Sequence, residues 1–432
     1  MKIVFYSTNT NAFDSSTFLI NVMPSNQEAF STFIHSHPED DFFCVSQKPA
    51  MFMPENMSVI LEPDADAEAF AQKITDLQAD FAIAMTFWTA PYDWLSISDA
   101  LVAEKVRQKG ITAICNPLEA SLICFDKWRT HNELARLGFD VAAAVFCDHD
   151  LYFCAGSNKE VLHNVYKESV LTQIRGLRLP VIIKDTTGLS SYGMTVAHTY
   201  GEVAGYLNSK RNNSNRLIEE FISGRQFGLE IYGVPGAYTV LPPFEFSVNQ
   251  YGITSPKQSV KYGPCDLSDD LHDMMLKLAE GLGLCGAAQV DLILDDDGQW
   301  HIIEVNPRLS GMTYTYAAAC GLSVFEMMYN TVIEPEHTVI EPVEITANLK
   351  KFVMSLKLPL MSESQMKEIL LLPGVRLLNQ TNDLAAKQER EKGFCECIIA
   401  ADEKSLLQNA VARFEELYPG DAIILQAKKI VE

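Results

Sequence analysis

The segment Val290–Arg308, VDLILDDDGQWHIIEVNPR, constrains what this chain can fold into more than any other stretch. Two apolar runs flank the dipeptide Asp297-Gly298, a combination typical of a β-hairpin with a two-residue turn. Counting outward from that turn places Asp291 directly opposite Glu304 on the neighbouring strand. The sequence therefore predicts a hairpin that brings two carboxylates face to face.

Polar side chains at the end of this hairpin share one face of the predicted sheet. Because side chains alternate along a strand, Glu304, Asn306 and Arg308 lie on one face, with Ile303 and Val305 on the other. Opposed like charges cost about 0.2–1 kcal/mol in a cross-strand pair unless a cation lies between them. Oxygen ligands from Asp, Glu and Asn suit Mg²⁺, which keeps water and substrate phosphates as its other ligands. The alternative is an acidic hairpin exposed to solvent.

Size and charge restrict the class of protein. A chain of 432 residues with 47% hydrophobic and 21% charged residues is long enough for two or three globular domains. Its 34 basic and 56 acidic residues give a formal net charge of −22. This charge argues against a nucleic-acid partner, whose phosphates would be repelled. An anionic small molecule would therefore need local positive charge at its site.

No feature of the sequence predicts export, a membrane span or a zinc site. The start, MKIVFYSTNTNAF, indicates a first β-strand and not a signal peptide, and no apolar run approaches the roughly 18 residues of a transmembrane helix. The ten cysteines are spread out, and Cys395 and Cys397 lack a second pair. His35 and His37 lack a further ligand at helical spacing and are expected in an ordinary loop. We expect reduced thiols in a cytoplasmic protein.

The order of apolar runs predicts a multidomain protein of the α/β and α+β classes. Residues 1–117 alternate strands with helices, which indicates an open, mostly parallel α/β domain; GxGxxG is absent after its first strand. Residues 118–337 begin with a helix closed by Gly138 and continue with strand-rich sequence, a helix near 271–282 and the hairpin. Residues 338–432 are expected to form a small C-terminal α/β lobe.

A loop rich in glycine and serine joins two predicted strands of the second domain. The strand PVIIK ends at Lys184, and DTTGLSSYG follows it. Glycines let a ligand approach the backbone, hydroxyl and amide groups donate to oxygens, and the lysine adds positive charge, which together suit a polyphosphate. The pattern of a Walker loop is absent, and a plain hairpin connection is the alternative. The loop residues of interest are Gly188, Ser190, Ser191 and Gly193.

Two further segments are candidates for nucleotide contacts. The stretch Arg216–Gly233 contains two apolar strands broken at Ser223-Gly224. The edge from Glu219 to Ile222 can offer one carbonyl and one amide to a planar base, although a simple hairpin explains the pattern equally well. Lys127 begins a predicted helix and can reach the same phosphates, whereas a single lysine at such a place is ordinarily solvated.

Four motifs occur in a specific order: DKWRTHNELARLGF, PVIIKDTTGLSSYGM, RLIEEFISGRQFGLE and QVDLILDDDGQWHIIEVNPRLSG. Over residues 126–328 this order resembles the ATP-grasp superfamily, and within it the carboxylate–amine ligase branch that contains biotin-carboxylase-like proteins and L-amino-acid ligases. The resemblance implies an ATP-grasp fold between the N-terminal α/β domain and the C-terminal lobe. It also implies small-molecule substrates, ATP, one or two Mg²⁺ ions with Mn²⁺ as a substitute, and, by analogy, a homodimer.

Family roles for the nucleotide transfer to residues that match these motifs. Lys127 and Lys184 resemble the two phosphate-binding lysines, and the segment from Gly188 to Gly193, with Ser190 and Ser191, resembles the loop that closes over the triphosphate. The adenine-binding hinge is matched by Glu219, Glu220 and Ile222, the last two acting through backbone atoms.

Metal and substrate roles follow in the same way. The resemblance assigns the magnesium ligands to Asp291, Glu304 and Asn306, with Asp where Glu is common, and it makes Arg308 and Lys184 the catalytic residues. Arg308 matches the arginine that steadies the phosphorylated intermediate. The residues after it, where related amino-acid ligases contact a side chain, are Ser310, Gly311, Met312, Thr313 and Tyr314, and among them Met312 and Thr313 are the specificity candidates.

A second substrate segment is predicted from composition. The aromatic-rich run Pro242–Gly263 contains Glu245, Lys257 and Lys261, which can hold an amino acid by its charged ends. An ordinary surface excursion is the alternative.

The expected reaction is the ATP-dependent joining of a carboxylate to an amine through an acyl phosphate. An amino acid and a second amino acid or small carboxylate would form an amide, with release of ADP and phosphate. Two alternatives remain open: a carboxylase-type or purine-pathway enzyme that activates bicarbonate or formate, and a nucleotide-binding protein without catalysis. No general base is identified from the residues.

Overall fold

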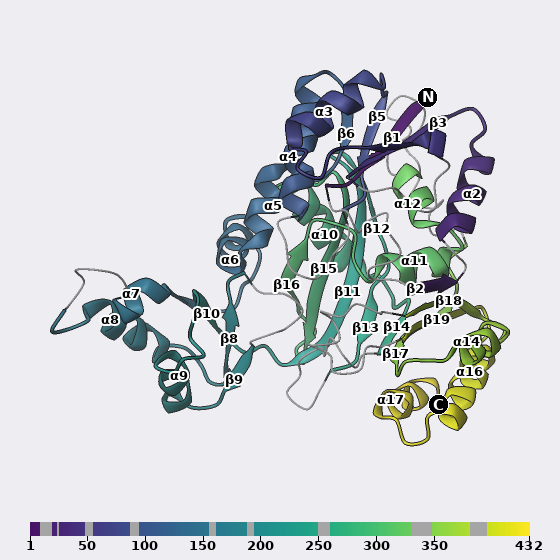
Figure 1. Cartoon of the computed structure of the whole chain (residues 1–432). Helices are drawn as coiled ribbons and strands as arrows, with labels where there is room; N and C mark the ends of the chain where they lie inside the picture. The colour runs from purple at the N-terminus through teal and green to yellow at the C-terminus, as the bar shows by residue number, and fades with distance from the viewer. Residues whose placement is uncertain are drawn as a thin grey trace.

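Three β-sheets organise the parts of the chain that the computed structural model describes (Figure 1). The described residues are 1–8, 20–23, 26–47, 55–86, 95–154, 161–187, 194–248, 260–330, 348–380 and 395–432. A five-stranded sheet lies at the top of the view, a ten-stranded sheet occupies the middle and lower right, and a four-stranded sheet projects to the left.

The N-terminal sheet is open and parallel, as predicted. Its strands run in the order β4-β3-β1-β5-β6, and buried apolar side chains pack on both of its faces, as expected for a parallel sheet covered by helices. Its strands are β1 (Lys2–Tyr6), β3 (Asp41–Ser46), β4 (Ser58–Ile60), β5 (Phe81–Ala84) and β6 (Thr112–Ile114). The accompanying helices are α2 (Asn26–Ser36), η1 (Glu55–Met57), α3 (Ala67–Asp76) and α4 (Leu95–Gln108).

The four-stranded sheet is antiparallel and has the order β7-β10-β8-β9. Helix α6 leads into it, beginning at the N-cap Asp126, whose carboxylate accepts from the amides of Trp128 and Arg129. Gly138, after the end of α6, has a φ of +75°, as the predicted closing glycine requires. The elements are α5 (Leu118–Phe125), α6 (Lys127–Arg136), β7 (Ala144–Cys147), α7 (His149–Phe153), α8 (Val165–Ile174), β8 (Val181–Asp185), β9 (Thr195–Ala197), α9 (Tyr200–Leu207) and β10 (Arg216–Glu220).

The ten-stranded sheet has the order β16-β15-β11-β13-β14-β17-β19-β18-β2, with β12 paired to β11. It crosses the predicted boundary at 337/338, because β14 pairs with β17 of the C-terminal region. Its strands are β2 (Ile20–Met23), β11 (Gly224–Val234), β12 (Ala237–Val240), β13 (Phe244–Phe246), β14 (Val260–Gly263), β15 (Gly286–Asp295), β16 (Trp300–Asn306), β17 (Phe352–Leu358), β18 (Val375–Gln380) and β19 (Cys395–Ala401). The helices are α10 (Asp269–Leu282), α11 (Thr313–Cys320), α12 (Val324–Asn330), α14 (Glu363–Leu370), α16 (Lys404–Leu417) and α17 (Ala422–Val431).

The hairpin of β15 and β16 pairs Asp291 with Glu304, as predicted, but its turn differs from the prediction. A two-residue turn would place Leu294 opposite His301, whereas Leu294 lies opposite Trp300 because the loop has three residues and the Asp295 amide bonds to the Gln299 carbonyl. A β-bulge between Asp291 and Leu292 then leaves Ile303 unpaired and restores the expected partner of Asp291.

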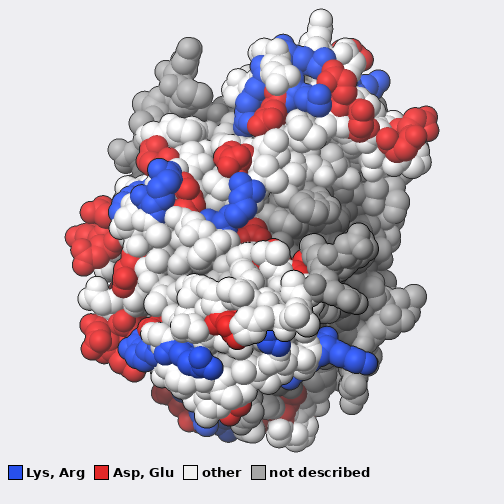
Figure 2. All heavy atoms as spheres, turned by 90° about the vertical axis from the view of Figure 1, so that its left-hand side faces the viewer, with Lys and Arg blue, Asp and Glu red and all other residues white. Residues whose placement is uncertain are grey.

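Thiols, helices and surface charge bear on the predicted class of protein. All ten cysteines are free thiols, as predicted. None of the described helices combines the length and the apolar character that a membrane crossing requires. On the face shown in Figure 2, Lys and Arg side chains lie in small groups interspersed with Asp and Glu, and they do not form one continuous basic surface.

Candidate active site

The surroundings of the two hairpin carboxylates shift their pKa values in opposite directions. Burial and the charge of Glu304 raise the pKa of Asp291. Burial also acts to raise the pKa of Glu304, but the nearby cations Lys127, Arg308 and Lys184 outweigh it and lower that pKa. Two opposed acids with several cations around them form a site where an additional divalent ion would be held by oxygen ligands.

Hydrogen bonds link this carboxylate pair to Arg308. The side chain of Gln289 donates to the Asp291 carboxylate over 2.6 Å, and the side chain of Asn306 donates to Oε1 of Gln289 over 2.9 Å. The Arg308 guanidinium donates in turn to Oδ1 of Asn306 over 2.9 Å. The side chain of Asn306 is therefore oriented from both ends, and Arg308 is held at the edge of the acidic pair.

Lys127 reaches this site from the start of α6, which lies far before the hairpin in the chain. Its Nζ lies 3.1 Å from Oε1 of Glu304, and its backbone amide donates to the Thr186 carbonyl over 2.7 Å. The first contact brings a cation to the carboxylate pair. The second ties the start of α6 to the end of β8, so that the helix, the four-stranded sheet and the hairpin meet at one place.

Lys184 lies in a second, smaller cluster with Glu219 and His131. Lys184 Nζ is 2.6 Å from Oε2 of Glu219, and Nδ1 of His131 is 3.3 Å from Oε1 of the same carboxylate. Burial alone would raise the pKa of Glu219, but Lys184 and His131 lower it to about 2. Lys184 is 8% exposed. The structure thus places the predicted phosphate-binding lysine and the predicted hinge acid in direct contact.

The predicted adenine hinge is a crossing between sheets and not a hairpin. Strand β10 belongs to the four-stranded sheet and β11 to the ten-stranded sheet. The amide of Glu220 donates to Ala143, and its side chain accepts from the Arg178 amide and pairs with the Arg178 guanidinium. Among the described residues, no backbone acceptor is found for the amide of Ile222. Of the amides of Glu220 and Ile222, the amide of Ile222 is thus the one that fits the predicted backbone contact with a base.

The predicted phosphate loop falls mostly outside the described residues. Gly188, Ser190, Ser191 and Gly193 are among the residues whose placement is not described, so their role stays a prediction. The strands on either side, β8 and β9, are antiparallel neighbours. The connection from β8 to β9 therefore begins directly after Asp185, next to Lys184 in the chain.

A buried acid, Glu230 on β11, holds the segment after Arg308 through hydrogen bonds, and the sequence did not suggest this role. The Glu230 carboxylate is fully buried and accepts from Ser310 Oγ at 2.8 Å, Thr313 Oγ1 at 2.7 Å and the Tyr232 hydroxyl at 2.7 Å. Ser310 Oγ also accepts from the Met312 amide. These bonds hold the start of α11 against β11.

This arrangement changes the expectation for substrate specificity. The side chains of Ser310, Met312 and Thr313 are 6%, 2% and 0% exposed, so the structure does not bring the two specificity candidates to the surface of the site. Met312 packs in the hydrophobic core and Thr313 bonds to Glu230. Gly311, which lies between Ser310 and Met312, is exposed. The sequence pattern alone does not distinguish a buried helix start from a substrate loop.

We expect the stability of the protein to depend on pH through Glu230. Burial raises the pKa of its carboxyl group from 4.5 to about 7, against the hydrogen bonds from Thr313, Tyr232 and Ser310. Between these values the folded protein binds more protons than the unfolded chain, so its stability falls as the pH rises, by about 3 kcal/mol for this group. The free energy of unfolding of Glu230→Gln, measured in urea relative to wild type, should therefore rise by up to that amount as the pH increases from 5 to 8. An equal gain for the exposed Glu62→Gln would contradict the assignment.

Glu245 and the two histidines expected in a loop lie apart from the carboxylate pair; His35 belongs to α2, whereas His37 follows that helix. Glu245 pairs with Arg225, on the face of the sheet opposite to Phe246, and the structure does not bring its side chain to the site. The ligand atoms of His37, Glu39 and Asp40 lie within 4.8 Å of one another. The Asp40 carboxylate already accepts from the N-terminal ammonium and the Tyr329 hydroxyl, which accounts for its position without a metal.

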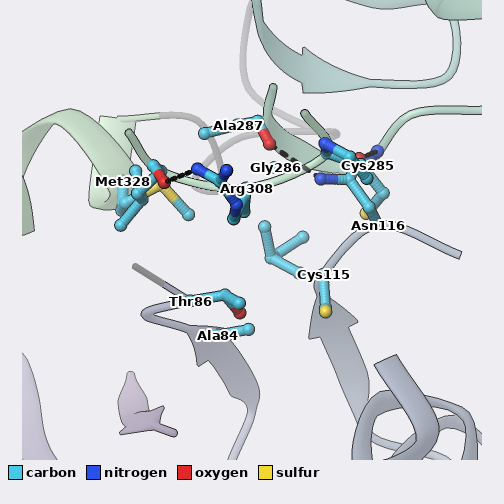
Figure 3. Close-up of a pocket in the computed structure, with 12 residues that line it drawn as sticks. Ala84, Thr86, Cys115, Asn116, Cys285, Gly286, Ala287, Arg308 and Met328 are labelled. Carbon is cyan, nitrogen blue, oxygen red and sulfur yellow. Dashed lines mark hydrogen bonds between the residues drawn. The ribbon is translucent and has the colours of Figure 1, made fainter. Parts of the chain in front are cut away.

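The turn that carries Arg308 rests on the N-terminal domain. The amide of Leu309 donates to the Thr86 carbonyl over 3.0 Å, and the Asn116 side chain forms two hydrogen bonds with β15 and the residue before it. Figure 3 shows Arg308 between Ala287 and Met328, across a small pocket from Thr86. Thr86 thus holds the residue after Arg308, and Asn116 holds the start of β15.

The side chains present fit a divalent cation with oxygen ligands. Asp291 and Glu304 supply carboxylate oxygens, and Asn306 supplies an amide oxygen that Gln289 and Arg308 orient. This donor set contains no thiolate or imidazole, which suits Mg²⁺ or Mn²⁺ better than zinc.

Sequence reasoning missed three residues of the site. Gln289 is two positions before Asp291 on the same strand, and His131 is one helical turn after Lys127, so the periodicity of strand and helix could have identified both. No such signal existed for Glu230, because its position opposite Gln289 depends on the pairing of β11 with β15.

Comparison with known proteins agrees with this geometry. Residues 155–334 match the family model "D-ala D-ala ligase C-terminus". A D-alanine–D-alanine ligase from Pediococcus pentosaceus is 31% identical over 170 residues, a match that spans 36% of this chain and 47% of that enzyme. The chain thus aligns with about half the length of this curated relative.

Two solved structures share the fold across nearly the whole chain. The L-amino acid ligase from Bacillus licheniformis has a TM-score of 0.64 at 14% identity, with 96% of each chain covered. The biotin carboxylase domain of the 2-oxoglutarate carboxylase from Hydrogenobacter thermophilus, solved with MgADP, ADP and bicarbonate, has a TM-score of 0.60 at 15% identity and covers 100% of this chain and 93% of its own. Residues 155–334 thus match a family model of the C-terminal part of D-alanine–D-alanine ligases, and these two likenesses show that the chain shares the fold of the two enzymes.

Proposed function

We propose that this protein is an ATP-dependent carboxylate–amine ligase that joins an amino acid to a second amino acid or to a small carboxylate. The observation that carries the proposal is the Asp291–Glu304 pair, with Lys127 in contact with Glu304 and Arg308 linked to the pair through Asn306. The match to the D-alanine–D-alanine ligase family and the fold of an L-amino acid ligase support the same class of reaction.

The chain supplies positive charge where two anions must meet. Magnesium ATP, when bound, supplies an activated γ-phosphoryl group. Asp291, Glu304 and Asn306 would hold the metal ion, and Lys127 and Lys184 would contact the phosphates. Neutralisation of this kind counts for most in a site from which water is excluded, because the lower local dielectric strengthens each interaction.

The proposed chemistry has two steps. A carboxylate oxygen of the first substrate attacks the γ-phosphorus, the bond from that phosphorus to the β,γ-bridging oxygen breaks, and ADP leaves. The amine nitrogen of the second substrate then attacks the acyl carbon, phosphate leaves with the bonding electrons, and the nitrogen loses its proton as the amide forms. Arg308 donates to Asn306, one of the proposed metal ligands, and would stabilise the negative charge of the acyl oxygen. Fixed positions matter because a free acyl phosphate would hydrolyse.

A phosphate-release screen tests this function. We expect at least one pair drawn from amino acids and small dicarboxylates to release phosphate from ATP, and the amide product to appear by mass spectrometry. Hydroxylamine added with the first substrate should trap the acyl group as a hydroxamate. If no pair releases more phosphate than buffer and no hydroxamate forms, the ligase proposal is wrong. Hydrolysis stimulated by bicarbonate or formate would instead favour the carboxylase-type reaction.

A further inference from the structure

Lys261 lies on the same face of the ten-stranded sheet as the acidic pair, away from the other lysines. In the pairing of β11, β13 and β14, Gln226 lies opposite Phe246, and Phe246 lies opposite Lys261. The Lys261 ammonium is 5.8 Å from the centre of the Phe246 ring and 3.3 Å from the carbonyl oxygen of Gly311. It therefore lies beside the one exposed residue of the segment that follows Arg308.

The three lysines near the site differ in their partners. Lys127 contacts Glu304 and Lys184 contacts Glu219, whereas Lys261 forms no ion pair with any described residue. Its charge lowers the pKa of Asp291 and Glu230, but burial raises both, and neither carboxylate lies within ion-pair distance. The segment 249–259, which precedes β14, contains no Asp or Glu. Lys261 is half-buried, and among the described residues its ammonium contacts a carbonyl oxygen and an aromatic ring but no carboxylate, which favours an anionic ligand.

The direction from which Lys261 approaches identifies the kind of anion. Lys127 contacts Glu304 on the edge strand β16, and Lys184 contacts Glu219 on β10, so both mark the side of the site where the phosphates are expected. Lys261 lies on β14, three strands beyond β15 in the opposite direction, next to Gly311. An anion there would extend away from the nucleotide, on the side of the substrate segment.

We propose that Lys261 binds the carboxylate of the substrate that supplies the amine. This carboxylate is not phosphorylated in the reaction. The second substrate is therefore an α-amino acid and not a simple amine. The inference rests on the proposed ligase function and deepens it. Phe246 forms the floor beside the ammonium, and Gly228 leaves room for its ring, since a Cβ at Gly228 would lie 2.3 Å from Phe246 Cζ. The amino acid would lie over this ring with its carboxylate on Lys261 and its amine toward Arg308.

The test compares each free α-amino acid with its own carboxamide, which lacks the negative charge. Binding is measured by the shift in Tm in the presence of MgADP, and KM by phosphate release. For wild type we expect at least one amino acid to bind about 10- to 100-fold more tightly than its carboxamide. Lys261→Met should lose this preference through weaker binding of the acid, with MgATP affinity unchanged, and Lys261→Arg should restore part of it.

Lys277→Met is a matched control. Lys277 also donates to a glycine carbonyl, that of Gly138, at 3.1 Å, and its Nζ lies 4.5 Å from the centre of the Phe139 ring, but it stands on α10 away from the acidic pair. Loss of a lysine with the same kinds of contact should therefore leave the preference for amino acids intact.

Each outcome separates this inference from the ligase proposal. If amide formation proceeds and Lys261→Met keeps the preference for the acid, or weakens MgATP as much as the amino acid, the inference is overturned and the ligase function stands. If amino acids bind through Lys261 but no pair releases phosphate, the binding inference stands and the ligase function fails. Binding of no amino acid, or of acid and carboxamide alike, also overturns the inference.

Discussion

Glu304→Gln is expected to lower kcat about 10³-fold while the protein remains folded. Glu304 is one of two opposed acids and the partner of Lys127, so its loss removes a charged oxygen ligand from the predicted metal site. A metal ion contributes several kcal/mol of transition-state stabilisation, and 1.36 kcal/mol corresponds to a factor of ten in rate. Because the change also relieves a like-charge contact, the free energy of unfolding should stay within about 1 kcal/mol of wild type. Steady-state phosphate release and urea unfolding measure the two effects.

The hairpin itself provides the control for this prediction. Asp296→Asn removes one negative charge from the exposed loop of the same hairpin and should leave kcat unchanged. Raising the Mg²⁺ concentration should recover part of the activity of Glu304→Gln, since the defect lies in metal affinity. A variant that unfolds but retains wild-type magnesium affinity would falsify the assignment of Glu304.

Lys184→Met should both abolish turnover and destabilise the protein, by about 3–5 kcal/mol, since it leaves a buried carboxylate without its main partner. Lys184 is 2.6 Å from Glu219, whose pKa of about 2 reflects Lys184 and His131 acting against burial. A carboxyl group with a lowered pKa stabilises the fold above its ordinary pKa of 4.5, and that contribution is lost as the pH falls toward 2. Wild type should thus lose this stability in acid, whereas Lys184→Met should already lack most of it at pH 7.

A double variant separates the two effects of Lys184. Lys184→Met combined with Glu219→Gln removes the buried charge, so urea unfolding should return toward wild type while phosphate release stays at background. Lys210→Met, at an exposed position after α9, controls for the loss of a lysine. If Lys184→Met unfolds at the same urea concentration as wild type, the Lys184–Glu219 pair contributes little to stability. If the double variant recovers activity, Lys184 has no role in phosphate binding.

The prediction of the acidic pair was correct although part of its reasoning was wrong. The turn has three residues where two were expected, which shifts the register by one near the loop. The bulge at Ile303 shifts it back, so that Asp291 faces Glu304. Turn residues and alternation identify a hairpin from sequence, but a bulge depends on how the strand packs and bends, which the local pattern does not encode.

The structure shows where several predicted site residues lie, while their roles toward the nucleotide stay predictions. Lys127 and Glu304 were expected near one ligand, and the structure brings them into contact. The hinge segment was compatible with a plain hairpin until the pairing showed that β10 and β11 belong to different sheets. Met312 was expected to face the substrate, but it is buried, because the helix that begins at Thr313 packs on Glu230. Whether a loop residue points to a ligand or to the core depends on contacts between elements distant in sequence.

The sequence by itself determined the features that depend on neighbours along the chain. These are the alternation that puts Glu304 and Asn306 on one face of β16, the closing glycine of α6 at Gly138 and the order of strands and helices in the N-terminal region. Local sterics and hydrogen bonds encode such features within a few residues.

Only the tertiary structure decided which of these features meet. The contact of Lys184 with Glu219, the buried Glu230 beneath the segment after Arg308, and the position of Lys261 beside Gly311 all join strands far apart in the chain. Their geometry follows from the pairing of β10 with β8 and of β11 with its neighbours β15 and β13. Such pairings are set by burial and packing over the whole sheet, and these long-range energies have no signature in any single segment.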